Sequence, residues 1–290
     1  MSSITDVYSP RTTFRCTRLR GAKVGSSVCQ FCAVGCSQLG FFKDGKLIDV
    51  EGDPRSAVNE GRLCPKGSST YALNDNPYRK VKPMYRAPGS DHWEEVTLDW
   101  MLDTVAKRIW DTRNKGFVEK DPATGITVNN CANIGFIGGS ANDNEECYLF
   151  RKLFTGGLGI LPVENSARYC HSTTVAALSP TFGFGACTNP PRDLLNSDCI
   201  LIMGSNMAEA HPCAFYWPMQ AKKKGAVTIH VDPRYTRTSA ACDHHVHIRP
   251  ETDIAFLSAV IRYILEKGLW FKEYVLAYTC LLYTSDAADD

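Results

Sequence analysis

Apolar residues in the second half of the chain fall into short continuous runs that alternate with helix-spaced positions. The runs cover residues 133–137, 198–203 and 226–231, and each has the length of a buried strand. Helical spacing follows over residues 145–154, 214–224 and 253–267. A repeat of strand, helix and strand is typical of a parallel sheet with crossover helices, so the sequence predicts an α/β fold.

Ligands of such sheets bind outside the carboxyl ends of the strands. The candidate binding loops are residues 138–144, 204–212 and 232–238. Residues that commonly begin or end helices lie at the bounds of the predicted helices. Thr97 or Asp99 can cap a helix over 98–110, and Gly225 can end the helix at 214–224. Thr252 or Asp253 can cap the helix at 253–267, which Gly268 ends.

Residues 26–67 show a different pattern, with four cysteines among Gly, Asp and Pro and one short apolar stretch at Lys46–Val50. We expect a small loop-rich lobe with a little β-structure. Its core is too thin to stand alone, so a cross-link is required. Residues 74–92 are rich in Pro and turn formers and are predicted to be a connector.

Composition narrows the function classes. The chain has 290 residues, 44% hydrophobic and 22% charged, with 32 Lys and Arg against 31 Asp and Glu. These values are typical of a globular protein, and the balanced charge does not favour general nucleic-acid or membrane-surface binding. No apolar run is long enough to predict a membrane span. The 13 cysteines are the unusual feature.

The two ends require separate treatment. Residues 1–27 contain scattered basic residues but no apolar segment that would indicate an export signal, so either the protein stays in the cytoplasm or its start lies upstream. Residues 280–290 (CLLYTSDAADD) match a translation of a sequencing-library adapter. We expect them to be an artefact and the native chain to be truncated near Thr279, with a natural polar tail as the alternative.

The cysteines at 29, 32 and 36 have the spacing C-x2-C-x3-C, and Cys64 follows in Cys64-Pro65-Lys66-Gly67. Four thiolates in this arrangement can bind a [4Fe–4S] cluster. Zinc is the first alternative, although a four-cysteine zinc site usually has two paired knuckles. A disulfide is the second alternative.

Three further residues are candidates for chemistry. Lys66 is either a solvated surface residue or an ammonium group close to an anionic cluster. Cys170 and His171 are adjacent, and such a pair is either catalytic or a buried small residue beside a turn histidine. The histidines at 244, 245 and 247 are predicted to lie in a surface loop rather than to bind metal.

Several ordered motifs together resemble one family over residues 28–279. They are CQFCAVGC, EGDP followed by RLCPKG, YRAPGS, ARYCHSTTVAALSPTFGFGACTN, MGSNMAEAHP, VDPRYTRTSA and RPETDIAFL. The chain resembles the catalytic subunit of molybdenum- or tungsten-dependent formate dehydrogenases that carry bis-(molybdopterin guanine dinucleotide), and most closely the respiratory envelope type.

The resemblance implies a domain order and a role for each motif residue. Residues 28–73 correspond to the cluster domain, after an extension at 1–27, and residues 74–279 to a truncated molybdopterin oxidoreductase α/β domain. Cys29, Cys32, Cys36 and Cys64 match the cluster ligands, and Lys66 matches a lysine between cluster and pterin. Cys170 matches the protein ligand to Mo or W, and His171 the neighbouring active-site histidine.

Other matched residues are implied to contact the pterin or its guanine dinucleotides. They are Ser140, Asn144, Asn206, Glu209, Asp232, Arg234 and Asp253. The implied reaction oxidises formate to CO2 and passes electrons to the cluster, then to an iron–sulfur subunit and a membrane cytochrome b. The implied location is the periplasm or cell envelope, although no export signal is visible.

Two departures from the family pattern matter. The family often has selenocysteine where this chain has Cys170. The arginine that clamps the substrate in the family lies beyond Thr279, so we expect this chain alone to be inactive. A nitrate reductase with the same cofactor and a non-catalytic electron-transfer subunit with the same fold are the alternative functions.

Overall fold

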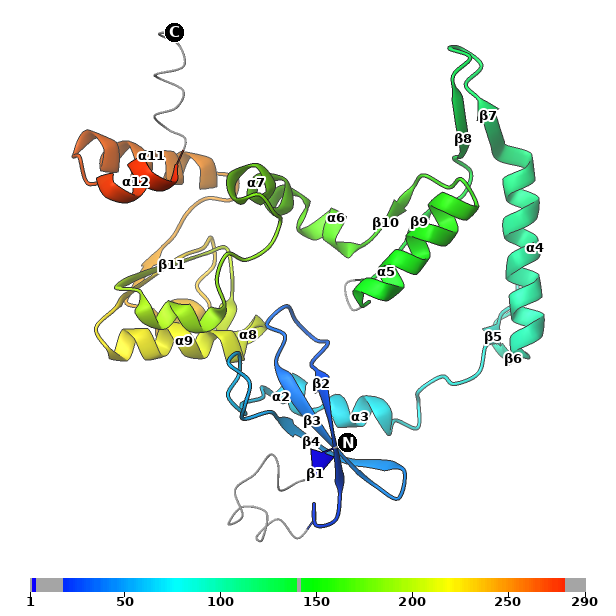
Figure 1. Ribbon diagram of the computed structural model, residues 1–290, viewed down its shortest axis with the longest axis horizontal. Coiled ribbons are helices and arrows are strands. Elements are labelled where there is room, and N and C mark those ends of the chain that lie inside the picture. Colours follow the sequence, from blue (N-terminus) through cyan, green and yellow to red (C-terminus); the bar gives the residue numbers. More distant parts are fainter. Residues whose placement is uncertain (1, 4–17, 140–141, 280–290) are drawn as a thin grey trace. The chain divides into compact units, whose positions relative to one another are not determined.

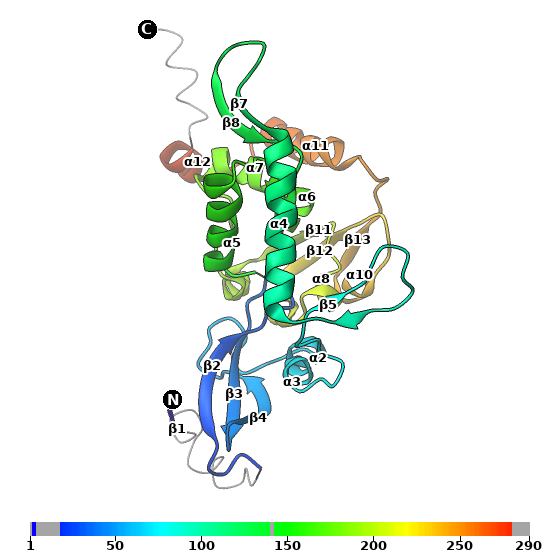
Figure 2. The same cartoon turned by 90° about the vertical axis from the view of Figure 1, so that its right-hand side faces the viewer.

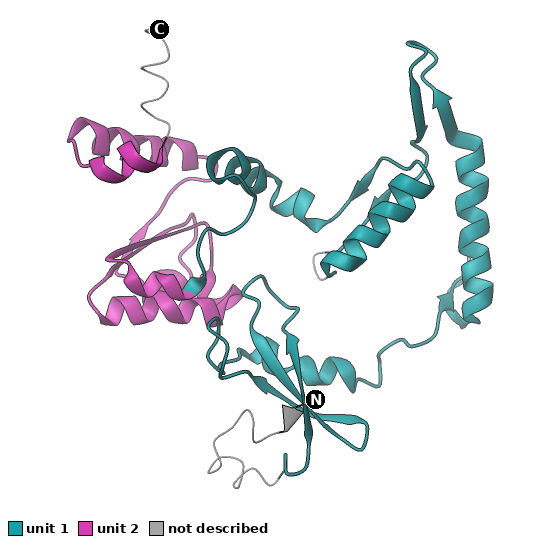
Figure 3. Ribbon diagram, in the orientation of Figure 1, with its two compact units in different colours: residues 1–191 teal, residues 192–290 magenta. Residues whose placement is uncertain are grey.

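The computed structural model describes residues 2–3, 18–139 and 142–279. The chain divides into two compact units, Met1–Pro191 and Arg192–Asp290, which Figure 3 distinguishes by colour. In the described residues, no helix is both long and apolar enough to cross a membrane.

Unit 1 begins with a four-stranded antiparallel sheet in the order β1–β2–β3–β4 (Figure 1). The strands are β1 (Ser2–Ser3), β2 (Lys23–Val28), β3 (Ser37–Lys43) and β4 (Lys46–Gly52). Asp44 and Gly45 form the two-residue turn between β3 and β4, and both have positive φ angles of 51° and 78°. An Asp-Gly turn of this kind matches the twist of a hairpin, which explains why these strands pair here.

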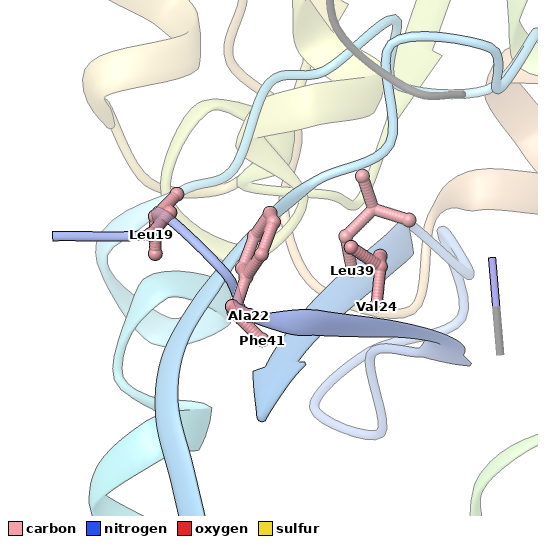
Figure 4. Close-up of a cluster of buried hydrophobic side chains, with 5 residues drawn as sticks. All are labelled: Leu19, Ala22, Val24, Leu39 and Phe41. Carbon is pink, nitrogen blue, oxygen red and sulfur yellow. The ribbon is translucent and has the colours of Figure 1, made fainter. Parts of the chain in front are cut away.

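Leu19, Ala22, Val24, Leu39 and Phe41 form the core of this sheet, and Ile48 packs against it (Figure 4). The lobe therefore has more β-structure, and a better-defined core, than the sequence indicates. Apolar side chains on one face of β2 and β3 supply this core, because residues two apart in a strand point to the same side.

Short elements connect the lobe to the rest of unit 1. Helices α2 (Pro65–Ser68) and α3 (Thr70–Asn74) precede the connector, which contains the hairpin of β5 (Met84–Tyr85) and β6 (Glu94–Glu95). Helix α4 spans Leu98–Gly116. Thr97 caps it, because its hydroxyl oxygen accepts a hydrogen bond from the backbone N–H of Trp100 at 3.3 Å.

The remainder of unit 1 contains two small sheets and several helices. Strands β7 (Phe117–Lys120) and β8 (Thr127–Cys131) form a hairpin, and β9 (Phe136–Ile137) pairs in parallel with β10 (Val163–Glu164). Between β9 and β10 lie α5 (Asn144–Arg151) and the π-helix η2 (Lys152–Gly157). Helices α6 (Ser166–Cys170) and α7 (Ser172–Phe182) follow.

The predicted strand at 133–137 is correct in position but too long. Only Phe136 and Ile137 pair with β10. The partner strand begins directly after Pro162, which has no backbone N–H to extend the ladder.

Unit 2 contains the predicted parallel sheet, in which β11 (Cys199–Met203), β12 (Val227–Val231) and β13 (His244–Val246) lie side by side (Figure 2). The helical elements are η3 (Pro191–Asn196), α8 (Met207–Ala210), α9 (Pro212–Lys223), α10 (Arg237–Ala241), α11 (Asp253–Glu266) and α12 (Lys272–Tyr278). Ile200, Ile202, Phe215, Ala221 and Ala226 form its core. The prediction of an α/β fold with a parallel sheet is confirmed.

One prediction in this unit is wrong. Residues 244–246 form strand β13 rather than a surface loop, because their backbone pairs with residues 229–231 of β12. Val246 and the buried Ile248 alternate with histidines, which is the period of a strand with one buried face.

Candidate functional site

The first three predicted cluster ligands lie in the loop between β2 and β3. The backbone N–H of Cys29 donates a hydrogen bond to the carbonyl oxygen of Cys36 at 2.8 Å, which closes the loop. Cys29 and Cys36 are buried, whereas Cys32 is half-buried. Gly35 has a φ of +66° and allows the chain to reverse direction before Cys36.

Asn59 ties this loop to the segment that carries Cys64. Its side chain is almost fully buried, with 1% of the residue exposed. The amide oxygen accepts from the N–H of Ser37 at 3.0 Å, and the amide nitrogen donates to the carbonyls of Ser37 at 3.1 Å and Arg62 at 2.8 Å. One side chain therefore joins the residue after Cys36 to a residue two positions before Cys64.

Two more contacts support the same arrangement. The Gln38 amide nitrogen donates to the carbonyl of Gly67 at 2.8 Å and lies 3.2 Å from the Thr70 hydroxyl. A Cβ atom on Gly52 would lie 2.4 Å from the carbonyl oxygen of Gly61, so the two backbone segments touch there. These contacts join the segment that carries Cys64 to β3, which directly follows the loop of the first three cysteines.

The thiols of Cys29, Cys32, Cys36 and Cys64 form no disulfide. In the described part of the chain, no three Cys, His, Asp or Glu side chains converge closely enough to hold a metal ion. Thiolates around a single tetrahedral zinc ion stand about 3.8 Å apart, given a Zn–S distance of about 2.3 Å. A four-iron cluster instead binds one thiolate at each iron, so its ligands are spread more widely. The structure places all four cysteines in the N-terminal lobe, on the loop between β2 and β3 and at the start of α2.

Lys66 lies in the four-residue helix α2, directly after the cysteine-proline pair. Cys64 is the N-cap residue of this helix, and Lys66 is exposed. Its position places an ammonium-bearing side chain two residues from the fourth predicted ligand.

Cys170 and His171 stand at the junction of two helices. Cys170 is the last residue of α6, and His171 lies between α6 and α7. The side chain of Asn165 caps α6 by accepting from the N–H of Ala167 at 2.9 Å. Both residues of the pair are exposed, so Cys170 is not the buried small residue that the structural alternative requires.

A cavity of about 510 Å³ lies next to this junction. Its lining comes from α5, β10, α6 and α7 and includes Cys147, Arg151, Arg168 and Ser172, but not Cys170 or His171. Arg168 is held by an ion pair with Glu164 at 2.7 Å. The cavity therefore borders the helices that present the pair, on a side other than that of the two side chains.

The glycine-rich loop before α5 is only partly described. Ser140 lies outside the described residues. Asn144 is the first residue of α5, whose cap is Asp143. The Asp143 carboxylate accepts from the N–H of Glu146 at 2.8 Å, and Glu146 accepts from the N–H of Asp143 at 3.3 Å, which forms a capping box.

In unit 2, the predicted nucleotide-contacting residues lie at the carboxyl edge of the parallel sheet. A cavity of about 450 Å³ is lined by Glu209, Arg234, Tyr235, Thr236, Arg237 and Ala240. Glu209 pairs with Arg237 at 3.0 Å and accepts a hydrogen bond from Asn206. Asp232 accepts from the N–H of Arg234 at 2.7 Å. Two arginines and one carboxylate give the cavity a positive balance that suits an anionic group.

Asp253 lies at the same edge of the sheet by topology. It is the first residue of α11, which follows β13, and it is exposed. The structure thus brings Glu209 and Arg234 around one cavity, with Asn206 and Asp232 bonded to that rim. Asp253 does not line the cavity.

Several buried residues that hold the loops of these sites together belong to no sequence motif that would have predicted this role. Asn59, Gln38 and His230 are buried polar residues that join separate loops. The available signal is a polar residue inside an apolar run, as with His230 in AVTIHV. A buried polar group requires a partner, but the sequence does not tell which one.

Two family models match the chain, the Molybdopterin oxidoreductase model over residues 79–270 and the Molybdopterin oxidoreductase Fe4S4 domain over residues 22–76. The chain belongs to the molybdopterin oxidoreductase family. This confirms the predicted family, with its four-iron cluster domain and molybdopterin domain. The roles of individual residues stay predictions.

Relatives within the family have specific names. The chain is 52% identical over 260 residues to formate dehydrogenase subunit alpha of Megalodesulfovibrio gigas, with 89% of this chain and 26% of the relative covered. It is 47% identical over 262 residues to formate dehydrogenase 2 subunit alpha (cytochrome c-553) of Nitratidesulfovibrio vulgaris, covering 90% and 26%. The formate dehydrogenase-O major subunit of Escherichia coli is 42% identical over 261 residues, covering 87% and 26%.

The fold also matches a solved structure, acetylene hydratase from Pelobacter acetylenicus, with a TM-score of 0.64 and 21% identity over 87% of this chain and 33% of that one. The chain spans about a quarter of the length of the three formate dehydrogenase subunits.

Proposed function

We propose that this chain is part of the catalytic subunit of a formate dehydrogenase, and that the complete protein interconverts formate and CO2. The main support is the 52% identity to a formate dehydrogenase alpha subunit over 89% of the chain. The exposed Cys170–His171 pair at the α6–α7 junction is also consistent with this proposal, because it offers a thiol and an imidazole to a bound group.

The residues present fit the cofactors of this family. Cys29, Cys32, Cys36 and Cys64 are soft donors without disulfides, and they would hold the four-iron cluster. Cys170 would supply a thiolate to molybdenum or tungsten, since soft ligands suit such a centre. Asn206, Glu209, Asp232 and Arg234 would hold a guanine dinucleotide arm of a bis-(molybdopterin guanine dinucleotide), with Ser140, Asn144 and Asp253 as further contacts.

When bound, the metal on its pterins supplies two-electron redox chemistry and the cluster supplies one-electron transfer. Conversion of formate to CO2 releases two electrons and one proton. His171, directly after Cys170, would accept that proton on a ring nitrogen. Lys66 contributes a positive charge two residues from Cys64, which stabilises an anionic cluster.

We also propose an iron–sulfur subunit as the next electron carrier, with a membrane cytochrome b beyond it. The location we infer is the periplasm or cell envelope, with the cytoplasm as the alternative. Fractionation of cells followed by immunodetection decides between these locations, and co-purification identifies the carriers.

The test of the proposed function uses the whole protein as its gene encodes it, purified without air. We expect formate-dependent dye reduction in the wild type and a fall of at least about 100-fold in Cys170→Ser, since even indirect partners of a metal ligand contribute about 10–100-fold. Cys199→Ser is the matched control, because Cys199 is an exposed cysteine at the start of β11.

Iron content measured on the same samples shows whether each variant keeps its cluster. Unchanged formate oxidation in Cys170→Ser contradicts the assigned role of Cys170. Nitrate reduction without formate oxidation in the wild type contradicts the proposed function.

A further inference from the structure

His230 occupies an unusual place in unit 2. It lies in the central strand β12, is fully buried, and uses both ring nitrogens in hydrogen bonds. The Nε2 atom lies 3.1 Å from the carbonyl oxygen of Ser205, in the loop after β11. The Nδ1 atom lies 2.7 Å from the hydroxyl oxygen of Ser239, in α10. One side chain therefore connects two segments that are 34 positions apart.

The partners fix the protonation state of this ring. A carbonyl oxygen only accepts, so Nε2 must carry the proton and donate to Ser205. Burial lowers the pKa of His230 below its ordinary value of 6.5, so the ring is neutral and Nδ1 accepts from the Ser239 hydroxyl. The Ser239 oxygen in turn accepts from the N–H of Thr236 at 2.8 Å. The result is a directed relay from Thr236 through Ser239 and His230 to Ser205.

This relay begins at a residue of the 450 Å³ cavity. Thr236 lines the cavity from the α10 side, and Glu209 lines it from the α8 side. A second buried tie crosses between the same two sides, because Thr238 donates to the Asn206 side chain at 3.1 Å and accepts from the N–H of Ala208 at 3.0 Å. The Glu209–Arg237 ion pair is the third tie and is exposed.

These three connections, through His230, through Thr238 and through the Glu209–Arg237 ion pair, differ in how directly a bound ligand contacts them. A group that enters the cavity meets the exposed Glu209–Arg237 pair directly, and exposed pairs are weak. The other two ties are formed by buried and partly buried groups, of which only Thr236 is among the residues that line the cavity. They set the separation of the cavity walls before a ligand arrives, and a preformed site binds more tightly because less ordering is needed.

We propose that His230 is a positioning residue for the nucleotide end of the cofactor: its hydrogen-bonded imidazole holds the loop after β11 and the first turn of α10 at the separation that an anionic nucleotide requires. This inference rests on the proposed cofactor and does not depend on which substrate the protein oxidises.

The test measures guanine nucleotide released by acid from the purified complete protein, per iron atom. We expect His230→Leu to lower this ratio about tenfold, the factor that corresponds to a net hydrogen bond of about 1.4 kcal/mol. His230→Gln keeps an amide that can donate to Ser205, and we expect its ratio to stay within about twofold of the wild type. His244→Leu is the matched control, since His244 is an exposed histidine of the same sheet.

Wild-type retention in His230→Leu overturns the proposal. Equal loss in His230→Leu and His230→Gln also overturns it, because the ring would then act through packing alone. If His230→Leu does not fold, Ser239→Ala replaces it, with a several-fold loss expected and wild-type retention contradicting the proposal. A protein without formate oxidation still gives the nucleotide ratio, so failure of the proposed function remains distinguishable.

Discussion

Asn59 and His230 are buried polar residues, and each joins loops that carry predicted ligands. Such residues are costly unless every polar atom finds a partner, and in both cases the partners are backbone or hydroxyl groups of separate segments. The predicted ligands themselves are exposed or half-buried at Cys32, Cys64, Cys170 and His171. Buried residues next to the predicted ligands therefore hold their loops, and these four predicted ligands stay accessible, whereas Cys29 and Cys36 are buried.

Asp243 gives a prediction at the residue scale. Its carboxylate accepts from Lys222 at 2.9 Å and from the backbone and hydroxyl of Thr228 at 2.9 and 2.8 Å. The hydrogen bond from Lys222, followed by those from Thr228, holds the pKa of Asp243 far below its ordinary value of 3.8. A lowered pKa in the folded state stabilises the fold above the unfolded value, and this contribution is lost as the pH falls below it.

We expect acidification from about pH 6 to about pH 3 to lower the protection of β12 amides, taken relative to the intrinsic exchange rate at each pH, more in the wild type than in Asp243→Asn, which cannot titrate there. Hydrogen exchange of β12, to which Thr228 belongs, is the measurement. Asp198→Asn is the control, since Asp198 is an exposed carboxylate just before β11. Identical acid responses in the wild type and Asp243→Asn contradict the expected role of this network.

Residue types were predictable from the sequence where the chemistry needs a rare type at a fixed spacing. The spacing of the four cysteines is such a signal, whereas Lys66, Cys170 and His171 gained their predicted roles through the family resemblance, and the roles of all of them stay predictions. Gln38, Thr238 and Ser239 have no such signal. Gln38 and Thr238 bind partners about 30 positions away, and the partner of Ser239 is His230 in strand β12. Pairings of this length are set by the fold and do not appear in local spacing.

At the scale of elements, the close approach of β4 to the segment before Cys64 is the tightest contact of the cluster lobe. A Cβ on Gly52 would lie 2.4 Å from the oxygen and 2.5 Å from the carbonyl carbon of Gly61. Both are backbone atoms, so a side chain at Gly52 forces the turn of residues 53–61 to move. That turn also contains Asn59, which fixes Arg62 and Ser37.

We therefore expect Gly52→Ala to destabilise the lobe by about 1–3 kcal/mol, as overpacking does, and to lower the iron and acid-labile sulfide content per chain. Gly25→Ala in β2 is the control, because its Cβ would meet only the Phe42 ring at 3.4 Å, an ordinary contact. A full iron content and unchanged stability in Gly52→Ala would show that the backbone adjusts without consequence for the ligands.

Element positions followed from periodicity, and element lengths did not. The helices at 98–116, 212–223 and 253–266 and the strands at 199–203 and 227–231 lie where the pattern predicts them. The antiparallel sheet of the cluster lobe was underestimated, because Gly, Ser and Gln in β2 and β3 hide the alternation. Strand β9 was overestimated, because its length depends on the partner that starts after Pro162.

At the scale of the whole molecule, the chain matches about 26% of the length of its relatives. The predicted ligands are divided between the two units, with the cysteines and His171 in unit 1 and the nucleotide-contacting residues Asn206, Glu209, Asp232, Arg234 and Asp253 in unit 2.

We expect the 290-residue chain, expressed by itself, to show no formate-dependent dye reduction, while the complete protein does. The reason is that the chain spans about 26% of the length of the formate dehydrogenase subunits it matches. The measurement is anaerobic dye reduction with equal amounts of both proteins. Turnover by the 290-residue chain would contradict this expectation.

The ties around the cysteine loop have a consequence for assembly. Asn59 and Gln38 join the segments of Cys36 and Cys64 through protein atoms alone. These hydrogen bonds do not depend on a bound cluster, so we expect the segments of Cys36 and Cys64 to stay joined when a cluster is absent. Insertion of iron and sulfide would then require no rearrangement of these two segments.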